Sequence, residues 1–125
     1  VLVDLGVEDA RLKWPNDVWI QGSKLAGILV ELANRGSSTI AVIGLGMNIA
    51  LTPEERAAVD QPIADLLSRG VAVDRNSLLM AFVEKMASYL RHFEHSGFEA
   101  FRSAFDAVHL LHRRDVVVHS ATEGK

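Results

Sequence analysis

The first half of the chain carries apolar runs separated by turn-forming residues, a pattern typical of β-strands joined by short loops. The runs lie near 12–20, 24–33 and 39–49, with Gly, Ser and Asn between them. The middle run is almost continuously apolar, which predicts a strand covered on both faces. Because short loops join antiparallel neighbours, the pattern predicts an antiparallel meander.

The second half has the spacing of helices. Residues 52–55 form a capping box with proline at the first helical position. Residues 62–68 predict a short helix that ends near Gly70. Asp74 predicts the cap of a helix of about twenty residues that ends at Gly97. The predicted apolar face of that helix consists of Leu79, Phe82, Val83, Met86, Leu90 and Phe93.

A further amphipathic helix is predicted over 98–108, where phenylalanines recur at helical spacing. Val116 to Val118 predict the beginning of another strand. Together these elements predict an α+β fold, in which a mixed, mainly antiparallel sheet is packed with helices.

The composition is that of a globular protein, because 49% of the 125 residues are hydrophobic, enough for the core of one domain. The net charge of −3 gives no broad basic surface, so this segment is not expected to bind nucleic acid. The absence of cysteine excludes disulfides, cysteine-ligated zinc and thiol catalysis, and is compatible with a cytoplasmic protein. No apolar run reaches the roughly 18 residues of a membrane helix, so no membrane association is expected.

Two glycines lie inside the third predicted strand, where glycine is unfavourable because it loses packing and costs backbone entropy. A bulge, or a ligand close to the sheet, would explain their presence. If the loop at 34–38 joins its strands without a bulge, Ala33 opposes Thr39. That register predicts one face with a nearly bare floor, suited to a flat small molecule. The residues on this predicted face are Lys24, Ala26, Ile28, Gly44, Gly46 and Asn48.

The turn at 21–23 places Asp17 opposite Gly27, so that Asp17 and Lys24 approach the same end of the sheet. A lysine there is a compact charge suited to a carboxylate or a phosphate, and adenylate formation needs such a charge. Taken singly, each signal has an ordinary structural explanation. Lys24 can be a solvated side chain, and Asn16 can simply form a turn. The Gly-x-Gly lacks the spacing of a dinucleotide-binding motif and can be purely structural.

Histidines offer a competing hypothesis of a metal site. His92 and His95 are three residues apart, as are His109 and His112, and this spacing sets two imidazoles on one helix face. No third ligand is clearly placed beside either pair, so exposed helical histidines are the preferred interpretation.

Three motifs, in this order, closely resemble the biotin–protein ligase family, which includes the bacterial biotin repressor/ligases. They are Lys-Trp-Pro-Asn-Asp at 13–17, Ser-Lys-Leu-Ala-Gly-Ile-Leu-Val-Glu at 23–31 and Ile-Gly-Leu-Gly-Met-Asn at 43–48. The resemblance extends from about Leu2 to Val118. It implies the class II synthetase-like biotin/lipoate ligase fold.

The resemblance implies ATP-dependent ligation of biotin to a lysine of a biotin carboxyl carrier protein. Biotin and ATP, accompanied by Mg²⁺, form biotinyl-5′-adenylate, and the carrier lysine then attacks the mixed anhydride. Such an enzyme is expected in the cytoplasm, and the exposed edge of the sheet is compatible with a homodimer. Two alternatives remain open: acyl transfer like that of a lipoate ligase or octanoyl transferase, and a non-catalytic ligase-like association domain.

By motif match, the resemblance implies that Lys24 contacts the biotin carboxyl group and the α-phosphate. Asp17 is expected to position the adenylate and to help the acceptor lysine react. Lys13 is expected at a phosphate and Asn48 at the adenine edge. The remaining expected site residues are Trp14 and Asn16 in the motif loop, and Gly27, Leu29, Gly44 and Gly46 along the biotin and adenylate groove.

The simple register conflicts with the resemblance at one point. It puts Gly27 and Leu29 on the face away from Lys24, whereas the resemblance implies that all three lie near one ligand. A bulge or a strong twist within 24–27 would reconcile the two.

For the domain organisation, residues 1–108 are expected to be the central and C-terminal part of the ligase catalytic domain. Residues 109–125 are expected to start a small C-terminal β-barrel domain. The family's arginine-rich biotin and phosphate loop is expected upstream of Val1, so the fragment alone is expected to be inactive.

Overall fold

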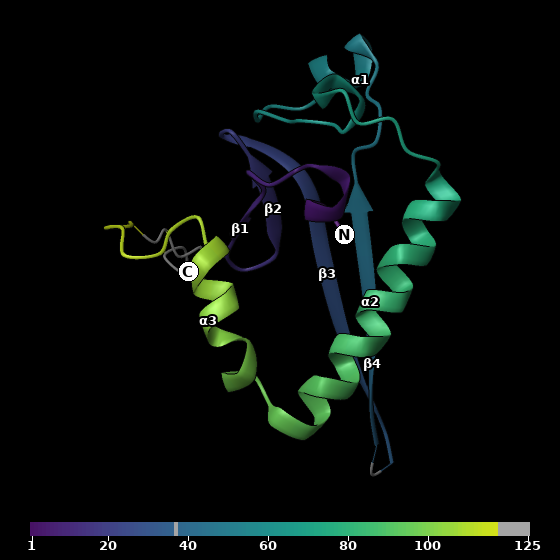
Figure 1. Ribbon diagram of the computed structural model, residues 1–125, viewed down its shortest axis with the longest axis vertical. Helices are drawn as coiled ribbons and strands as arrows, with labels where there is room; N and C mark the ends of the chain where they lie inside the picture. The colour runs from purple at the N-terminus through teal and green to yellow at the C-terminus, as the bar shows by residue number, and fades with distance from the viewer. Residues whose placement is uncertain (37, 118–125) are drawn as a thin grey trace, which may run out of the picture.

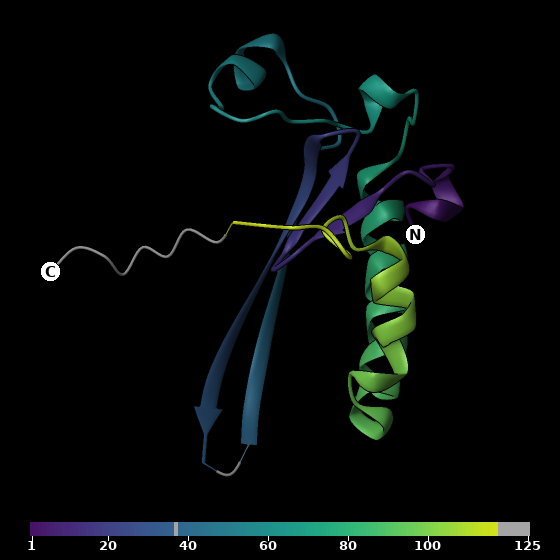
Figure 2. The ribbon, with the colours of Figure 1, turned by 90° about the vertical axis from the view of Figure 1, so that its left-hand side faces the viewer.

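The computed structural model describes residues 1–36 and 38–117, which form a four-stranded sheet with two long helices on one side (Figures 1 and 2). The strands are β1 (Arg11–Lys13), β2 (Asp17–Ile20), β3 (Ser23–Arg35) and β4 (Ser38–Met47). They lie in the order β1-β2-β3-β4, and each neighbouring pair is antiparallel. The predicted α+β class and antiparallel meander are therefore confirmed.

Three α-helices follow the strands, and their predicted ends are present. They are α1 (Pro53–Ala57), α2 (Arg75–Ser96) and α3 (Glu99–Val108). In the capping box of α1, the Glu55 N–H donates to Thr52 Oγ1 at 3.2 Å and the Thr52 N–H donates to Glu55 Oε2 at 2.8 Å. Asp74 caps α2 by accepting from the Ser77 N–H at 2.8 Å, and Gly97 follows its last turn.

The short helix predicted over 62–68 is wrong for most of its length. A single 3₁₀ turn, η2 (Leu67–Arg69), forms there. Residues 62–64 are extended because they bond to the start of β3. The Lys24 N–H donates to the Pro62 carbonyl and the Ala64 N–H donates to the Lys24 carbonyl, both at 2.9 Å. Pairing with the sheet thus replaces the helical hydrogen bonds.

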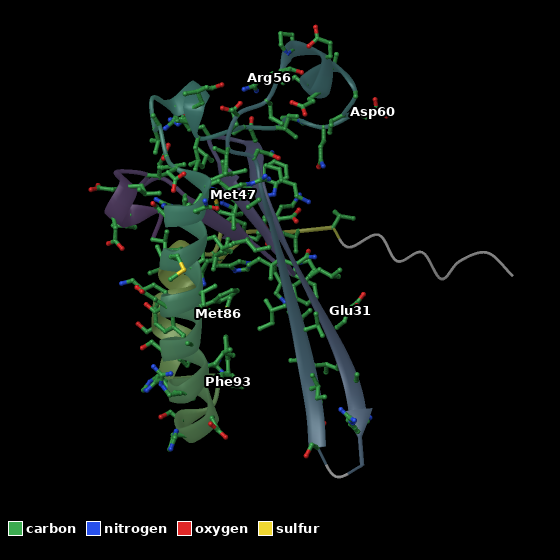
Figure 3. All side chains as sticks on the ribbon, turned by 90° about the vertical axis from the view of Figure 1, so that its right-hand side faces the viewer. Glu31, Met47, Arg56, Asp60, Met86 and Phe93 are labelled. Carbon is green, nitrogen blue, oxygen red and sulfur yellow. The ribbon has the colours of Figure 1, made fainter. Side chains whose placement is uncertain are left out.

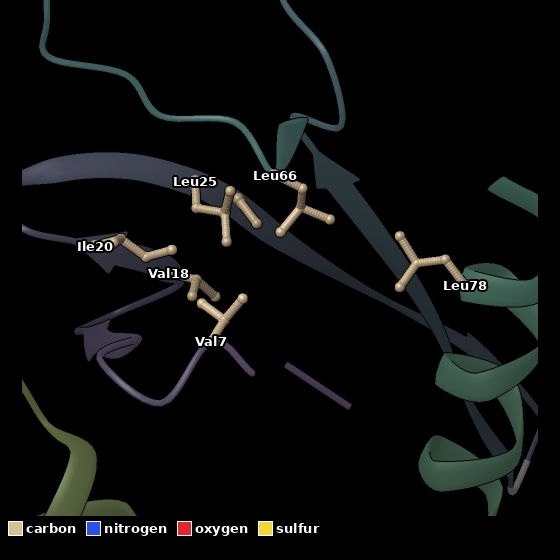
Figure 4. Close-up of a cluster of buried hydrophobic side chains, with 7 residues drawn as sticks. Val7, Val18, Ile20, Leu25, Leu66 and Leu78 are labelled. Carbon is tan, nitrogen blue, oxygen red and sulfur yellow. The ribbon is translucent and has the colours of Figure 1, made fainter. Parts of the chain in front are cut away.

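The core lies at the end of the sheet where β3 begins, next to the N-terminal segment that contains η1 (Val3–Leu5) (Figure 4). Its buried apolar residues are Val7, Val18, Ile20, Leu25, Ala26, Leu66 and Leu78. From α2 the core receives Leu78, whereas Leu79 and Val83 are exposed, so the predicted apolar face is wrong at these two positions. Leu90 and Phe93 of the predicted face are also exposed and line the groove between α2 and α3 instead of the core. The contacting stripe runs instead through Leu78 and Phe82, which are one helical turn apart.

The turn between β3 and β4 decides which side chains share a face. Arg35 pairs with Ser38, so the paired strands are separated by two residues of sequence instead of the predicted five. The change from an odd to an even number moves every β4 side chain to the other face relative to β3. Gly46 therefore opposes Gly27 and not Ala26, and the predicted register is wrong. The neighbouring pairs are Ala26 with Met47, Ile28 with Leu45, and Leu29 with Gly44.

A β-bulge in β3 brings Lys24 to the face that carries Gly27. Val18 pairs with Ala26 but Trp19 pairs with Lys24, so one extra residue, Leu25, lies between them on β3. Leu25 is fully buried in the core, so the bulge turns Lys24 and Leu25 to different surroundings. A bulge within 24–27, which would reconcile the register with the resemblance, is thus present.

The far end of the β3–β4 hairpin is uncovered in the described structure. Its exposed apolar residues are Val30, Leu32, Ile40 and Val42. Figure 2 shows this end sloping away from α2 and α3, and Figure 3 shows Glu31 on the side turned away from α2. The prediction of a strand covered on both faces is wrong for this half, because an apolar run specifies a strand but not what packs on it.

After α3 the chain returns to the sheet edge at β1, where the Leu110 N–H donates to the Leu12 carbonyl at 2.7 Å. Val116 and Val117 lie in no strand, and residues 118–125 of the predicted barrel unit lie outside the described residues. The domain division at 108/109 stays a prediction. Among the described residues, no helix combines the length and the apolar character needed to cross a membrane.

Candidate active site

A lysine and an aspartate meet on the face of the sheet that points away from α2 and α3. Leu12 lies against these helices, and because strand side chains alternate, Lys13 and its partner Asp17 occupy the opposite face. Lys24 Nζ lies 2.7 Å from Asp17 Oδ1, and the two side chains are 28% and 21% exposed. The pair is partly desolvated by the sheet and still open to a ligand. Asp17 pairs with Gly27 as predicted, although the turn is one residue shorter than predicted and the bulge at Leu25 makes up the difference.

The pair forms part of a hollow of about 450 Å³, which we name the sheet hollow. Other residues of its lining are Asn16, Gly27, Leu29, Gly44 and Gly46. Its volume lies within the range of small-molecule sites, and its lining combines an apolar floor with a few charged or polar groups. Such a lining holds a ligand by its shape and orients it by one charged end.

The glycines leave this floor open. A Cβ on Gly27 would lie 3.5 Å from Lys24 Nζ and 3.6 Å from Asp17 Oδ1. A Cβ on Gly46 would have the Gly27 carbonyl oxygen, 4.0 Å away, as its nearest neighbour. These distances are ordinary contacts, so the glycines do not relieve a clash. What a larger side chain at these positions would do is fill the hollow.

A second hollow of about 430 Å³ shares Lys24, Gly27 and Gly46 with the first and extends toward α1. We name residues 49–61 the flap and this cavity the flap hollow, because the flap forms its outer wall. The flap residues in this wall are Leu51, Glu55, Ala58, Val59 and Gln61. Lys24 therefore lies where the two hollows meet.

Asn48 lies in the lining of the flap hollow but does not oppose Lys24 as predicted. Its backbone N–H donates to the Leu25 carbonyl at 3.0 Å. Its side-chain Nδ2 donates to the carbonyls of Ala64 at 3.0 Å and of Lys24 at 3.4 Å. The amide thus joins β3 to the segment that follows the flap. Its contact with the adenine edge stays a prediction.

The other motif residues differ in how close they come to the hollows. Asn16 lines the sheet hollow, and its carbonyl accepts from the Ile28 N–H at 2.7 Å. Lys13 Nζ lies 4.2 Å from the centre of the Trp19 ring, at cation–π distance, and lines neither hollow. Trp14 is exposed and also lines neither. The structure therefore brings Asn16 to the site and leaves Lys13 and Trp14 beside it.

Among the described residues, no comparable site forms around the helices. Within residues 1–36 and 38–117, no group of three or more His, Cys, Asp or Glu side chains is placed to hold a metal ion. His92 packs edge-on against Phe101, and His95 Nδ1 lies 2.7 Å from the Arg91 carbonyl oxygen. The groove between α2, α3 and β1 has a volume of about 450 Å³, but its lining is almost wholly apolar. It has no charged group to orient a charged substrate.

The flap, as a wall of the candidate site, was not predicted from the sequence. The available signal was the capping box at 52–55, which starts a helix soon after the strand that carries the glycines. Asp65 was not predicted either; it is buried, accepts from the Ser68 N–H at 2.7 Å and pairs with Arg56. The signal there was a charged residue placed directly before two leucines.

Residues 6–48, which contain the sheet hollow, match the model of the biotin/lipoate A/B protein ligase family. The chain is 38% identical over 107 residues to the bifunctional ligase/repressor BirA of Escherichia coli K12, covering 85% of this chain and 33% of that protein. It is 40% identical over 86 residues to the biotin–[acetyl-CoA-carboxylase] ligase of Mycobacterium tuberculosis, covering 68% of this chain and 30% of that protein. The chain thus spans about a third of the length of these curated relatives.

Solved structures of biotin protein ligases are also similar to this chain. The apo biotin protein ligase of Aquifex aeolicus superposes with a TM-score of 0.67 at 28% identity, over 81% of this chain and 44% of that chain. The same organism's enzyme in complex with biotin and ATP superposes with a TM-score of 0.65 at 26% identity, over 81% of this chain and 42% of that chain. The four-stranded sheet and its helices therefore have the fold of a biotin protein ligase.

Proposed function

Because the chain belongs to the biotin/lipoate A/B protein ligase family, we propose that it supplies part of the site at which biotin is joined to a protein lysine with consumption of ATP. The observation that carries the proposal is the position of Lys24 and Asp17 at the junction of the sheet hollow and the flap hollow. One hollow is available for biotin and the other for the nucleotide, and the charged pair lies between them.

In the first proposed step, a carboxylate oxygen of biotin attacks the α-phosphorus of ATP. The bond from that phosphorus to the bridging oxygen of the β-phosphate breaks, which yields biotinyl-5′-adenylate and pyrophosphate. Two anions must approach each other in this step. Lys24 reduces their repulsion and stabilises the charge that develops on the phosphoryl oxygens. The shared place of Lys24 in both hollows supports this role.

In the second proposed step, the amine of a carrier-protein lysine attacks the carbonyl carbon of the adenylate, and AMP leaves with the electron pair of the broken anhydride bond. The attacking amine must lose a proton. Asp17 is the carboxylate in the lining of the sheet hollow, and we assign to it the orientation of that amine and the acceptance of its proton. Its contact with Lys24 holds it in place.

The other expected residues have supporting roles in this proposal. Gly27, Leu29, Gly44 and Gly46 form the floor for biotin, and Asn16 lies at its edge. Asn48 lies near the nucleotide base, and Lys13 and Trp14 act from beside the hollows. The Mg²⁺ that accompanies ATP would be held mainly by phosphate oxygens and water, as is usual for this ion, and would offset phosphate charge.

The proposed acceptor is a biotin carboxyl carrier protein, in keeping with the name of the Mycobacterium tuberculosis relative. We place the reaction in the cytoplasm. The outer edge of β4 is the proposed surface for a homodimer, because edge strands offer unpaired backbone groups. We also propose that the 125 residues do not complete the reaction alone, since the floor of the sheet hollow is open and Leu29 is exposed.

Lipoate is the alternative acyl substrate, because the matching family includes lipoate ligases. Pyrophosphate exchange into ATP by the full-length protein, driven by biotin or by lipoate in parallel, distinguishes the two. We expect exchange with biotin. Exchange with lipoate but not with biotin would show that lipoate, and not biotin, is the acyl substrate. If calorimetric titration detects binding of neither biotin nor ATP, the remaining hypothesis is a non-catalytic association domain.

Replacing Lys24 by alanine tests the role of the charge at the junction. We expect Lys24→Ala to lower the rate of adenylate formation by at least about a hundredfold, the usual loss when one group stabilising a transition-state charge is removed. The stability should change by less than about 1 kcal/mol, because partly exposed ion pairs contribute little. Lys85→Ala is the matched control, since Lys85 lies on α2 and its nearest carboxylate oxygen, on Asp4, is 3.9 Å away. Near-normal pyrophosphate release by Lys24→Ala would refute the assignment.

A further inference from the structure

We propose that Arg56 is a positioning residue that holds the flap closed over the flap hollow and thereby sets the affinity for the nucleotide. The inference rests on the proposed function, because it takes ATP as the occupant of that hollow. Arg56 lines neither the sheet hollow nor the flap hollow, so its effect must pass through the position of α1.

Both feet of the flap are bonded to the start of β3. At the first foot, the Asn48 N–H donates to the Leu25 carbonyl at 3.0 Å. At the second foot, Pro62 and Ala64 bond to the backbone of Lys24, each at 2.9 Å. The side chain of Asn48 joins the two feet through the Ala64 carbonyl at 3.0 Å. The ends of the flap are therefore fixed to the sheet.

The middle of the flap is held much less firmly. α1 has five residues, none of which is buried, and its capping box links Thr52 and Glu55 only to each other. A helix this short is not stable by itself. Among the described residues, the hydrogen bonds that join α1 to other segments all come from Arg56. The closed position of α1 thus depends on one side chain.

Arg56 lies on α1, and Figure 3 shows its position at this end of the molecule. It forms an ion pair with Asp65, which lies just before η2. Its Nη2 pairs with Asp65 Oδ2 and donates to Ser68 Oγ, and its Nη1 donates to the Ile63 carbonyl at 3.5 Å. Asp65 is 1% exposed and also accepts from the Ser68 N–H at 2.7 Å and the Ser68 hydroxyl at 3.0 Å. A buried carboxylate needs a cation and a full set of donors, so Arg56 is strongly favoured at this place.

The closed position matters because Glu55, Ala58 and Val59 then form the outer wall of the flap hollow. Without Arg56 the two feet stay bonded, but the wall between them has no fixed place. A ligand that requires the wall must then order it, and its apparent dissociation constant rises as the closed fraction falls. Charge-assisted hydrogen bonds of this kind shift such an equilibrium by about tenfold to a hundredfold.

The test uses the full-length protein and two measurements on the variant Arg56→Ala. Pyrophosphate exchange should show a KM for ATP raised by about tenfold or more, with kcat within about twofold and an unchanged KM for biotin. Hydrogen–deuterium exchange of peptides from 50–61 should become faster while the rest of the sheet keeps its protection. Arg56→Lys, which retains the charge but not the fork of donors, should fall between Arg56→Ala and the wild type.

Arg69→Ala is the matched control. Arg69 is an arginine of similar exposure, 33% against 34% for Arg56, and it pairs with Asp9 at 2.8 Å away from the flap. It should leave the KM for ATP unchanged. If Arg56→Ala does not fold because Asp65 is left as a buried charge, the double variant Arg56→Ala/Asp65→Asn removes that charge and answers the same question.

The results separate this inference from the proposed function. A wild-type protein with biotin-dependent exchange, combined with an Arg56→Ala variant of unchanged KM for ATP or unchanged flap protection, overturns the role of Arg56 alone. A wild-type protein with no exchange and no ATP binding overturns the proposed function and this inference with it.

Discussion

The two halves of the β3–β4 hairpin are built from similar residues but lie in different surroundings. In the near half, Leu25 is fully buried against the core, and the opposite face carries the Lys24–Asp17 pair and the glycine floor. In the far half, Leu32 is 70% exposed, and apolar side chains project from both faces of the strands. The near half has a supporting layer and a bare side, whereas the far half has two bare sides in the described structure.

This difference shows what a site on a sheet requires. At the bulge, Leu25 points into the core while Lys24 turns to the face that carries the sheet hollow. The floor formed by the glycines is useful only because its other side is packed and cannot collapse. The far half has the same hydrogen-bonded ladder but no packing behind it, so strand pairing alone does not build a site.

The largest expected effect is on the core side of the near half. Leu25→Ala should reduce the free energy of unfolding by about 3 kcal/mol, because it removes buried methyl groups and leaves a cavity. Leu32→Ala makes the same chemical change in the far half and should alter it by less than about 0.5 kcal/mol. Urea unfolding of the full-length protein measures both. If Leu32→Ala lowers the free energy of unfolding as much as Leu25→Ala does, the two halves do not differ in the way described, because the far half must then be covered in the protein.

A smaller effect is expected on the ligand side of the near half. A Cβ on Gly44 would meet Leu29 at 3.9 Å, an ordinary contact, so Gly44→Val should fold. Its added methyl groups fill the floor, and we expect the KM for biotin to rise by about tenfold. Ala33→Val adds two methyl groups on an exposed far-half position and serves as the control. Equal KM values for the two variants would contradict the assignment of the floor to biotin.

The smallest expected effect concerns the helix that supports the near half. The pKa of Asp74 is lowered from its ordinary 3.8, mainly by the backbone N–H of Ser77 and then by the Ser77 hydroxyl. A carboxyl group with a lowered folded-state pKa stabilises the fold above its unfolded-state value, and the contribution is lost as the pH falls through the folded-state value. The stability difference between the wild type and Asp74→Ala should therefore be constant above the ordinary pKa and shrink below it.

Urea unfolding at a series of pH values on both sides of the ordinary pKa measures this difference. A gap between wild type and Asp74→Ala that stays the same as the medium becomes acidic would show that the charged cap does not stabilise α2. α2 contributes Leu78 to the core just after this cap. The measurement therefore also shows how strongly the stability of the near half depends on α2.

Local signals were sufficient for most elements of the fold. The capping box at 52–55, the Asp74 cap and Gly97 each act through neighbouring backbone groups, so their positions follow from a few adjacent residues. The same holds for the turn after Ile20, where Gln21 and Gly22 both take positive φ as a tight hairpin requires. The predicted pairing of Asp17 with Gly27 is correct, but the turn alone does not produce it. The turn pairs Ile20 with Ser23, and the bulge at Leu25 then shifts the partner of Asp17 from Ala26 to Gly27.

Features that depend on parity or on distant partners were not predictable in this way. The connection between Arg35 and Ser38 has two residues instead of the predicted five, and this change of parity shifts the register of β4 by one residue, which puts Gly44 and Gly46 on the face of Gly27. The segment 62–64 has the apolar character of a helix but is extended, because Lys24 offers it backbone partners nearly forty residues earlier in the chain. The burial of Asp65 depends likewise on Arg56.

The sequence by itself indicated the family of this protein, most of its strands and helices, and the two charged residues of the candidate site, because motifs and short-range hydrogen bonding depend on neighbouring residues. Tertiary structure alone decided which face carries the glycines, how the bulge at Leu25 turns Lys24 to it, and how Arg56 and Asp65 hold the flap over it. The physical reason is that side-chain direction in a sheet alternates with every residue, so a single step in register or a single distant partner reassigns a whole face.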